Sequence, residues 1–247
     1  DLILKPNAPR QSHVVSISAG SDAVKTKASI AYDKIGALYE GRSYQRITAR
    51  FNNDATINDM LSASLDFFLK RSISEQPSVD PMYFGMMSAP IYPAVWSDGR
   101  IASGKQGANI YGQLKYGGFR DDWYNTVGGK AQLDFSPIEG LQLSAVISPN
   151  FGFNKGKDFI KAVPYYSAED PTVYGGTMQW ASSTRLSEGR SDNYQVTTQF
   201  LANYARTFGL HNITALAGYE NYYAFYENLG ASRDEFELTS FPYLNLG

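Results

Sequence analysis

Residues 61–70 read LSASLDFFLK, and this stretch decides the fold class. Its odd-numbered residues are apolar, whereas its even-numbered residues are mainly polar. Successive side chains of a β-strand point to opposite faces of a sheet, so the stretch predicts a strand with one apolar face and one mainly polar face. A helix would place apolar residues three or four positions apart, and that spacing is scarce throughout the chain.

The same alternation recurs in about seven further stretches, separated by junctions rich in Gly, Pro, Asn and Asp that are typical of turns. We therefore predict an all-β protein, built as an antiparallel meander of about eight strands. The expected strands are residues 12–19, 23–33, 44–52, 60–72, 125–135, 141–148, 193–207 and 212–223.

Short and long connections alternate along this meander. The turns at 20–22, 53–58, 136–140 and 208–211 are brief, whereas the connections at about 34–43, 73–124 and 149–192 are longer, and another irregular segment is expected from residue 224. All long connections then lie at one end of the sheet, as they do in transmembrane β-barrels. Connections as long as 73–124 and 149–192 are unusual in a compact soluble domain unless they are functional.

Alternation alone leaves other folds open. A soluble β-sandwich also buries one face of each strand and exposes the other to water. Strand length and the placement of the long connections favour the barrel, whose apolar side chains should face outward, whereas those of a sandwich face inward. A secreted β-sandwich that binds glycans is the alternative, and a β-rich glycosidase domain is a third possibility.

The composition excludes several classes of site. The chain has no cysteine, which rules out disulfides and thiolate ligands, and its formal charge of −2 gives no electrostatic footprint for nucleic acid. It has no run of eighteen apolar residues, so no transmembrane helix is expected. The first residues, DLILKP, lack the layout of a signal peptide, so we expect that one was cleaved or that the chain begins within a longer protein.

Four segments carry a resemblance to a known family. Residues 11–21 read QSHVVSISAGS, residues 28–32 and 44–52 read ASIAY and YQRITARFN, and residues 211–220 read HNITALAGYE. The first resembles the segment that opens the barrel in SusC/RagA-type TonB-linked outer-membrane proteins of Bacteroidetes. The second pair is similar to that family's next hairpin, and the last resembles its strands that end in Gly-Tyr-Glu. The resemblance spans most of the chain and is most distinctive in the first fifty residues and in 194–220.

The resemblance implies a barrel of 22 strands with a plugged lumen, of which this chain would form about eight. Residues 1–247 are therefore expected to be a partial barrel that lacks the TonB box, the carboxypeptidase-like domain and the plug. The implied function is import of a large nutrient, an oligosaccharide or a peptide, across the outer membrane. The implied partners are a SusD-like surface lipoprotein, TonB and outer-membrane lipid.

Aromatic side chains in the two long connections are candidates for ligand binding, because exposed rings offer flat apolar area with polar edges. The other explanation, which the sequence favours, is packing of the loops against each other or an aromatic girdle where strands leave a membrane. The candidates are Tyr83, Tyr92, Trp96, Tyr111, Tyr166 and Trp180.

Other polar residues carry weaker signals. Lys25, Lys27, Arg46, Arg50, Lys70 and Lys130 fall on the polar faces of the expected strands, where they would line a lumen. His13 and His211 have no metal ligand at suitable spacing, and the carboxylate pairs Asp121-Asp122 and Glu169-Asp170 lie in or beside the long connections. We expect no catalytic residue, metal or cofactor.

Overall fold

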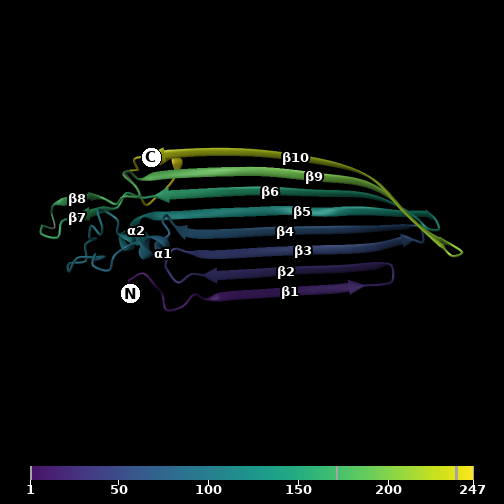
Figure 1. The fold of residues 1–247 in the computed structure, drawn as a ribbon, viewed down its shortest axis with the longest axis horizontal. Coiled ribbons are helices and arrows are strands. Elements are labelled where there is room, and N and C mark those ends of the chain that lie inside the picture. Colours follow the sequence, from purple (N-terminus) through teal and green to yellow (C-terminus); the bar gives the residue numbers. More distant parts are fainter. Residues whose placement is uncertain (1, 171, 237–238, 247) are drawn as a thin grey trace.

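The computed structural model describes residues 2–170, 172–236 and 239–246. In these residues eight long strands form one antiparallel sheet in the order β1-β2-β3-β4-β5-β6-β9-β10 (Figure 1). The prediction of an all-β antiparallel meander is confirmed. The strands are β1 (Arg10–Gly20), β2 (Val24–Gly36), β3 (Ser43–Asn58), β4 (Leu61–Pro77), β5 (Gly118–Ile138), β6 (Leu141–Ile160), β9 (Arg185–Phe208) and β10 (His211–Asp234).

Tight turns close the four hairpins. The Ser21 hydroxyl accepts a hydrogen bond from the Val24 N–H (3.2 Å), and Gly140 and Gly209 have φ angles of +84° and +60°. Glycine adopts such angles at little cost, because it has no Cβ. These three turns lie within the ranges expected at 20–22, 136–140 and 208–211, to within one residue.

The turn expected at 53–58 is wrong. These residues belong to β3, where Asn53 pairs with Leu65 of β4, and the chain reverses only at residues 59–60. Asn is typical of turns because its side chain bonds local backbone. Here the Asn53 amide donates instead to the Thr26 hydroxyl on the neighbouring strand (2.6 Å), which satisfies it within the sheet.

Strand length rises from 11 residues in β1 to 24 in β9 and β10. The connections are accordingly shorter than expected: 37–42, 78–117 and 161–184, in place of 34–43, 73–124 and 149–192, and β10 runs beyond residue 224. In the extra residues charged side chains such as Asp121 and Asp122 occur on both faces of a strand, among apolar ones such as Phe119 and Phe159, so the alternation ends. The main-chain ladder continues, as in the pairing of Asp122 with Gly156 and of Gly156 with Gly189.

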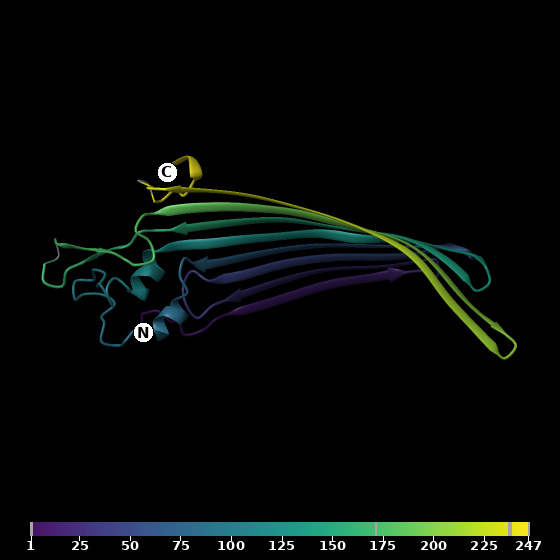
Figure 2. The same cartoon turned by 45° about the horizontal axis from the view of Figure 1, so that its top comes forward.

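The longer connections and the last residues gather at one end of the twisted sheet (Figure 2). The connection 78–117 contains α1 (Pro81–Met86) and α2 (Ile110–Tyr116), and 161–184 contains the hairpin β7 (Pro164–Tyr166) and β8 (Tyr174–Thr177). The helices are too short to give a periodic signal, but capping residues mark both starts: Asp80 accepts from the N–H of Met82 (2.9 Å), and Asn109 from that of Gly112 (3.1 Å). Neither helix, nor any other helical segment in the described ranges, could cross a membrane.

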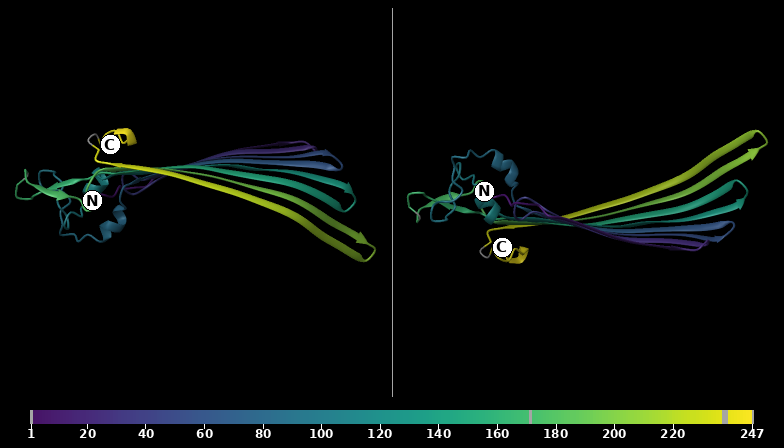
Figure 3. Two further views of the ribbon diagram at one scale, coloured as in Figure 1. Left: turned by 90° about the horizontal axis from the view of Figure 1, so that it is seen from above. Right: turned by 90° about the horizontal axis from the view of Figure 1, so that it is seen from below.

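The buried core is small and lies at this same end. Phe159 and Leu186 are fully buried beside Phe236, and Phe119 and Leu244 pack against them. The C-terminal segment with η1 (Leu244–Leu246) covers one side of the sheet here, while α1 and α2 lie on the other side (Figure 3). Beyond this end the sheet is a single layer. A β-sandwich would bury the apolar faces of two sheets against each other, and no such packing exists in the described part of the chain.

Candidate functional site

The strand register collects the apolar side chains on one face of the sheet. One cross-strand row illustrates this: Ala55 pairs with Ala63, Ala63 with Leu133, Leu133 with Ala145, and Ala145 with Phe200. We call the surface made by such rows the apolar belt. The belt consists of every second residue of four strands: Leu61 to Leu69 on β4, Val127 to Phe135 on β5, Leu143 to Phe151 on β6 and Tyr194 to Ala202 on β9.

The belt is exposed although it is apolar. Leu65 is 50% exposed and Phe200 is 56% exposed, so nothing in the described residues covers them. From Leu143 to Phe151 the belt spans about 27 Å along β6 at ~3.4 Å per residue, or about 21 Å after a strand tilt of ~40°. With the side chains at its borders, this height matches the apolar band of about 25 Å that faces lipid in outer-membrane barrels.

Aromatic rings line the border of the belt that faces the loops. Tyr194 stacks on Phe151 (ring centroids 5.9 Å apart) and lies beside Tyr223 (5.4 Å) and Phe225 (5.9 Å). Rings with an apolar body and a polar hydroxyl are enriched where strands cross from lipid to water. The aromatic girdle considered for the loop residues is thus better matched by these strand residues, which the sequence analysis did not single out.

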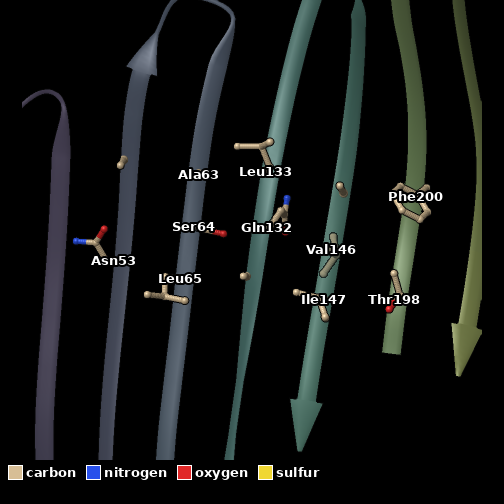
Figure 4. Close-up of a pocket in the computed structure, with 13 residues that line it drawn as sticks. Asn53, Ala63, Ser64, Leu65, Gln132, Leu133, Val146, Ile147, Thr198 and Phe200 are labelled. Carbon is tan, nitrogen blue, oxygen red and sulfur yellow. The ribbon is translucent and has the colours of Figure 1, made fainter. Parts of the chain in front are cut away.

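A shallow hollow of about 490 Å³ interrupts the belt (Figure 4). It forms where the small side chains of Ala63, Ala131 and Ala145 lie between Leu65, Leu133 and Phe200. Its lining offers few polar groups that could orient a ligand. The hollow is therefore part of the uneven apolar surface, suited to contact with mobile hydrocarbon chains.

The opposite face of the sheet is polar. All six basic residues expected there share it: Lys25, Lys27, Arg46, Arg50, Lys70 and Lys130. Arg46 forms an ion pair with Asp33 (2.8 Å), and Lys130 lies 3.6 Å from Asp66. In the described residues no charged side chain lies within the belt, so one sheet separates a hydrated face from an apolar one.

The two long connections hold each other in place. The Trp96 indole N–H donates to the Tyr166 carbonyl (3.2 Å), and the Arg100 guanidinium donates to the Ser167 carbonyl (3.0 Å). Asn109 is buried and donates to the Ala94 and Ala102 carbonyls (2.6 and 2.8 Å), which fixes the chain before α2. Residues 78–117 and 161–184 therefore form one packed unit.

The six candidate aromatics are distributed over this unit. Tyr83, on α1, lies edge-on to Phe84, which in turn contacts Trp180 (ring centroids 5.1 and 5.0 Å apart). Trp96 meets Tyr166 through the hydrogen bond above. Tyr92 is exposed and Tyr111 lies on α2, and neither has a ring partner among the described residues. The structure thus brings Trp96 and Tyr166 into direct contact, links Tyr83 and Trp180 through Phe84, and leaves the other two candidates apart.

A cleft of about 590 Å³ opens where β5 begins and β6 ends. Its lining combines the rings of Tyr116, Phe119 and Tyr166 with the basic side chains of Arg100, Lys115 and Lys161. Only Tyr166 was a candidate from sequence. Arg100 and Lys115 come from the connection 78–117 and Lys161 comes from 161–184, and no shared pattern along the chain could have linked the three.

Two of these cations have carboxylate partners. Arg100 contacts Asp98 (2.6 Å), and Lys115 contacts Glu40 (2.5 Å). The hydrogen bond from Lys115 lowers the pKa of the Glu40 carboxyl, and the same contact raises the pKa of Lys115. Lys161 lies over the ring of Phe159 (5.5 Å) and forms no ion pair within the described ranges.

The remaining polar candidates do not converge. Asp121 and Asp122 lie within β5, not in a loop, and as neighbours in a strand they point to opposite faces. His13 stacks on Tyr32 of β2, and His211 begins β10. Across residues 2–170, 172–236 and 239–246, no cluster of three or more His, Asp or Glu side chains could hold a metal ion.

Comparisons with known proteins identify the fold. No family model matches the sequence, and no curated protein matches it. The RagAB peptide transporter is similar in structure, with a TM-score of 0.74 and 17% identity over 100% of this chain. The RagAB peptide importer in its closed-closed state is similar with a TM-score of 0.76 and 18% identity over 100% of this chain. In its open-open state it is similar with a TM-score of 0.76 and 19% identity over 97% of this chain. This chain spans only 27–28% of the length of those chains.

Proposed function

We propose that these residues form part of the barrel of an outer-membrane importer of large nutrients. The observation that carries the proposal is the uncovered apolar belt, whose height suits a bilayer, on a sheet whose other face is charged. Such a sheet is stable where hydrocarbon covers the belt and water or a plug contacts the polar face. The chain then catalyses no reaction and serves as a channel wall.

The sheet edges support the same proposal. No strand of the described residues pairs with the outer edge of β1 or of β10. Free edges and a bare apolar face promote aggregation in water, whereas further strands would remove both edges by closing a barrel. We infer that the polar face lines the lumen and that Arg50 and Lys70 contact the plug or cargo.

The cargo and partners are also proposals. The similar structures are described as a peptide transporter or importer, which favours a peptide over an oligosaccharide as cargo. The loop unit, with its exposed Tyr83 and Tyr92, lies at the end where a SusD-like surface lipoprotein would deliver cargo. TonB would supply the energy through segments outside these 247 residues.

The test is the location and mass of the native protein. An antibody against residues 78–117 should detect an outer-membrane species of roughly 100 kDa, because 27.3 kDa here covers 28% of the similar chains. Its gel mobility should change on boiling, as expected of a stable barrel. A soluble 27 kDa species would contradict the proposal and favour a secreted sandwich assembled from two copies of the sheet.

A further inference from the structure

The cleft at the start of β5 is lined by basic side chains, which favour an anionic ligand. Arg100, Lys115 and Lys161 contribute three positive charges, and no Asp or Glu of the described residues lines it. Asp98 and Glu40 neutralise the first two from outside the lining. Within residues 2–170, 172–236 and 239–246, Lys161 is thus the basic residue of the cleft that forms no ion pair. Its ammonium can donate a charge-assisted hydrogen bond to a carboxylate.

The cleft also has apolar walls. The rings of Phe119, Tyr116 and Tyr166 line it, and Val163 at its base is 3% exposed. Its volume of about 590 Å³ falls within the range of small-molecule sites, which combine apolar walls with a few polar groups that orient the ligand. The ligand that fits is an apolar group carrying one carboxylate.

The basic groups are held in place before any ligand arrives. The backbone N–H of Lys161 donates to the Gly117 carbonyl (2.8 Å), which fixes the main chain where β6 ends beside the start of β5, and the Lys161 ammonium lies over the Phe159 ring (5.5 Å). Arg100 is fixed from two sides, by Asp98 and by the Ser167 carbonyl. Groups already fixed in position lose little conformational entropy on binding, so the contact with a carboxylate is strengthened.

We propose that this cleft binds the free C-terminal carboxylate of a peptide at Lys161, with the last side chain packed against Phe119 and Tyr166. The inference rests on the proposed importer function, which supplies the peptide. It adds a preference that the importer function alone does not require: peptides with a free, apolar C-terminal residue should bind better than their amides.

The experiment uses the intact protein purified in detergent and isothermal titration calorimetry. The probes are N-acetyl-Ala-Ala-Phe and its C-terminal amide. We expect the acid to bind roughly tenfold more tightly, as is typical of a hydrogen bond to a charged group. About 0.5 M NaCl should reduce this preference by screening. Inorganic phosphate should displace the acid no better than acetate does.

Three variants separate charge from fold. Lys161→Gln should abolish the preference for the acid, while Lys161→Arg should keep it. Lys105→Gln, at an exposed lysine of the connection 78–117 outside the cleft, should bind as the parent does.

Equal binding of acid and amide, or a preference that persists in Lys161→Gln, would overturn the inference and leave the outer-membrane location untouched. Stronger displacement by phosphate than by acetate would overturn the carboxylate assignment. A protein found outside the outer membrane would defeat the importer proposal, yet the calorimetry would still decide the preference of the cleft.

Discussion

A single arginine scan along β4 tests whether the apolar belt faces lipid. Leu65 lies at the centre of the belt on this strand, Leu69 lies at its loop-side border, and Ser64 lies on the polar face beside Leu65. Leu65→Arg should destabilise the barrel by about 2–4 kcal/mol, which is the cost of arginine on the lipid face at the bilayer midplane. Leu69→Arg should cost only ~0–1 kcal/mol, because its side chain reaches the interface.

The loss of stability in Leu65→Arg depends on what surrounds the sheet, because Leu65 is already 50% exposed in the sheet. An arginine at an exposed position in water changes stability by only about 0.5 kcal/mol, so a large effect requires hydrocarbon around the belt. The assay is guanidinium unfolding of the intact protein in lipid vesicles, with Ser64→Arg as the matched control. Equal effects of Leu65→Arg and Leu69→Arg, or a larger effect of Ser64→Arg, would refute a lipid-facing belt.

Three further predictions concern the turns and loops. Gly140→Val should destabilise the protein more than Gly209→Ala in the same unfolding assay. Both glycines have a positive φ angle, but of the two only Gly140 has a backbone oxygen close to where a Cβ would lie, at 2.7 Å. Asp80→Ala should speed amide exchange across α1, since loss of an N-cap costs about 1 kcal/mol. The Glu40–Lys115 contact should hold at neutral pH and be lost as pH falls through the lowered pKa of Glu40, which exchange of residues 37–42 at decreasing pH would detect.

The sequence predicted the fold well where alternation is strict. Residues 61–69 have one face in the belt and one on the polar face, and this contrast produced both the strand and its orientation. It failed where charged residues lie on both faces of a strand. Asp121 and Lys157 lie in paired strands, yet the sequence around them alternates no better than a loop does. Main-chain hydrogen bonds hold such strands together, and these bonds do not require any particular pattern of side chains.

The candidate site was less accessible to prediction. The sequence shows that the long connections are rich in aromatic residues, but it does not show what these residues contact. The Trp96 indole donates to the Tyr166 carbonyl of the other connection, and only the fold brings the two together. The cleft is a stronger example. Lys161 is unremarkable in sequence, and its importance arises because β6 ends beside the start of β5, where Arg100 and Lys115 also reach the cleft.

The unequal strand lengths connect the belt to the loops. The belt covers nine residues of β9, from 194 to 202, whereas the strand starts at Arg185. The nine residues between extend about 30 Å along the strand at ~3.4 Å each. At the loop end β9 therefore extends well beyond the belt, whereas β1, with 11 residues, is scarcely longer than the belt. In the proposed membrane location, the longer strands would hold the loop unit and its cleft away from the lipid headgroups, where a cargo could reach Lys161 from water. The charged residues on both faces of these extensions, which made them resemble loops in the sequence, fit that position.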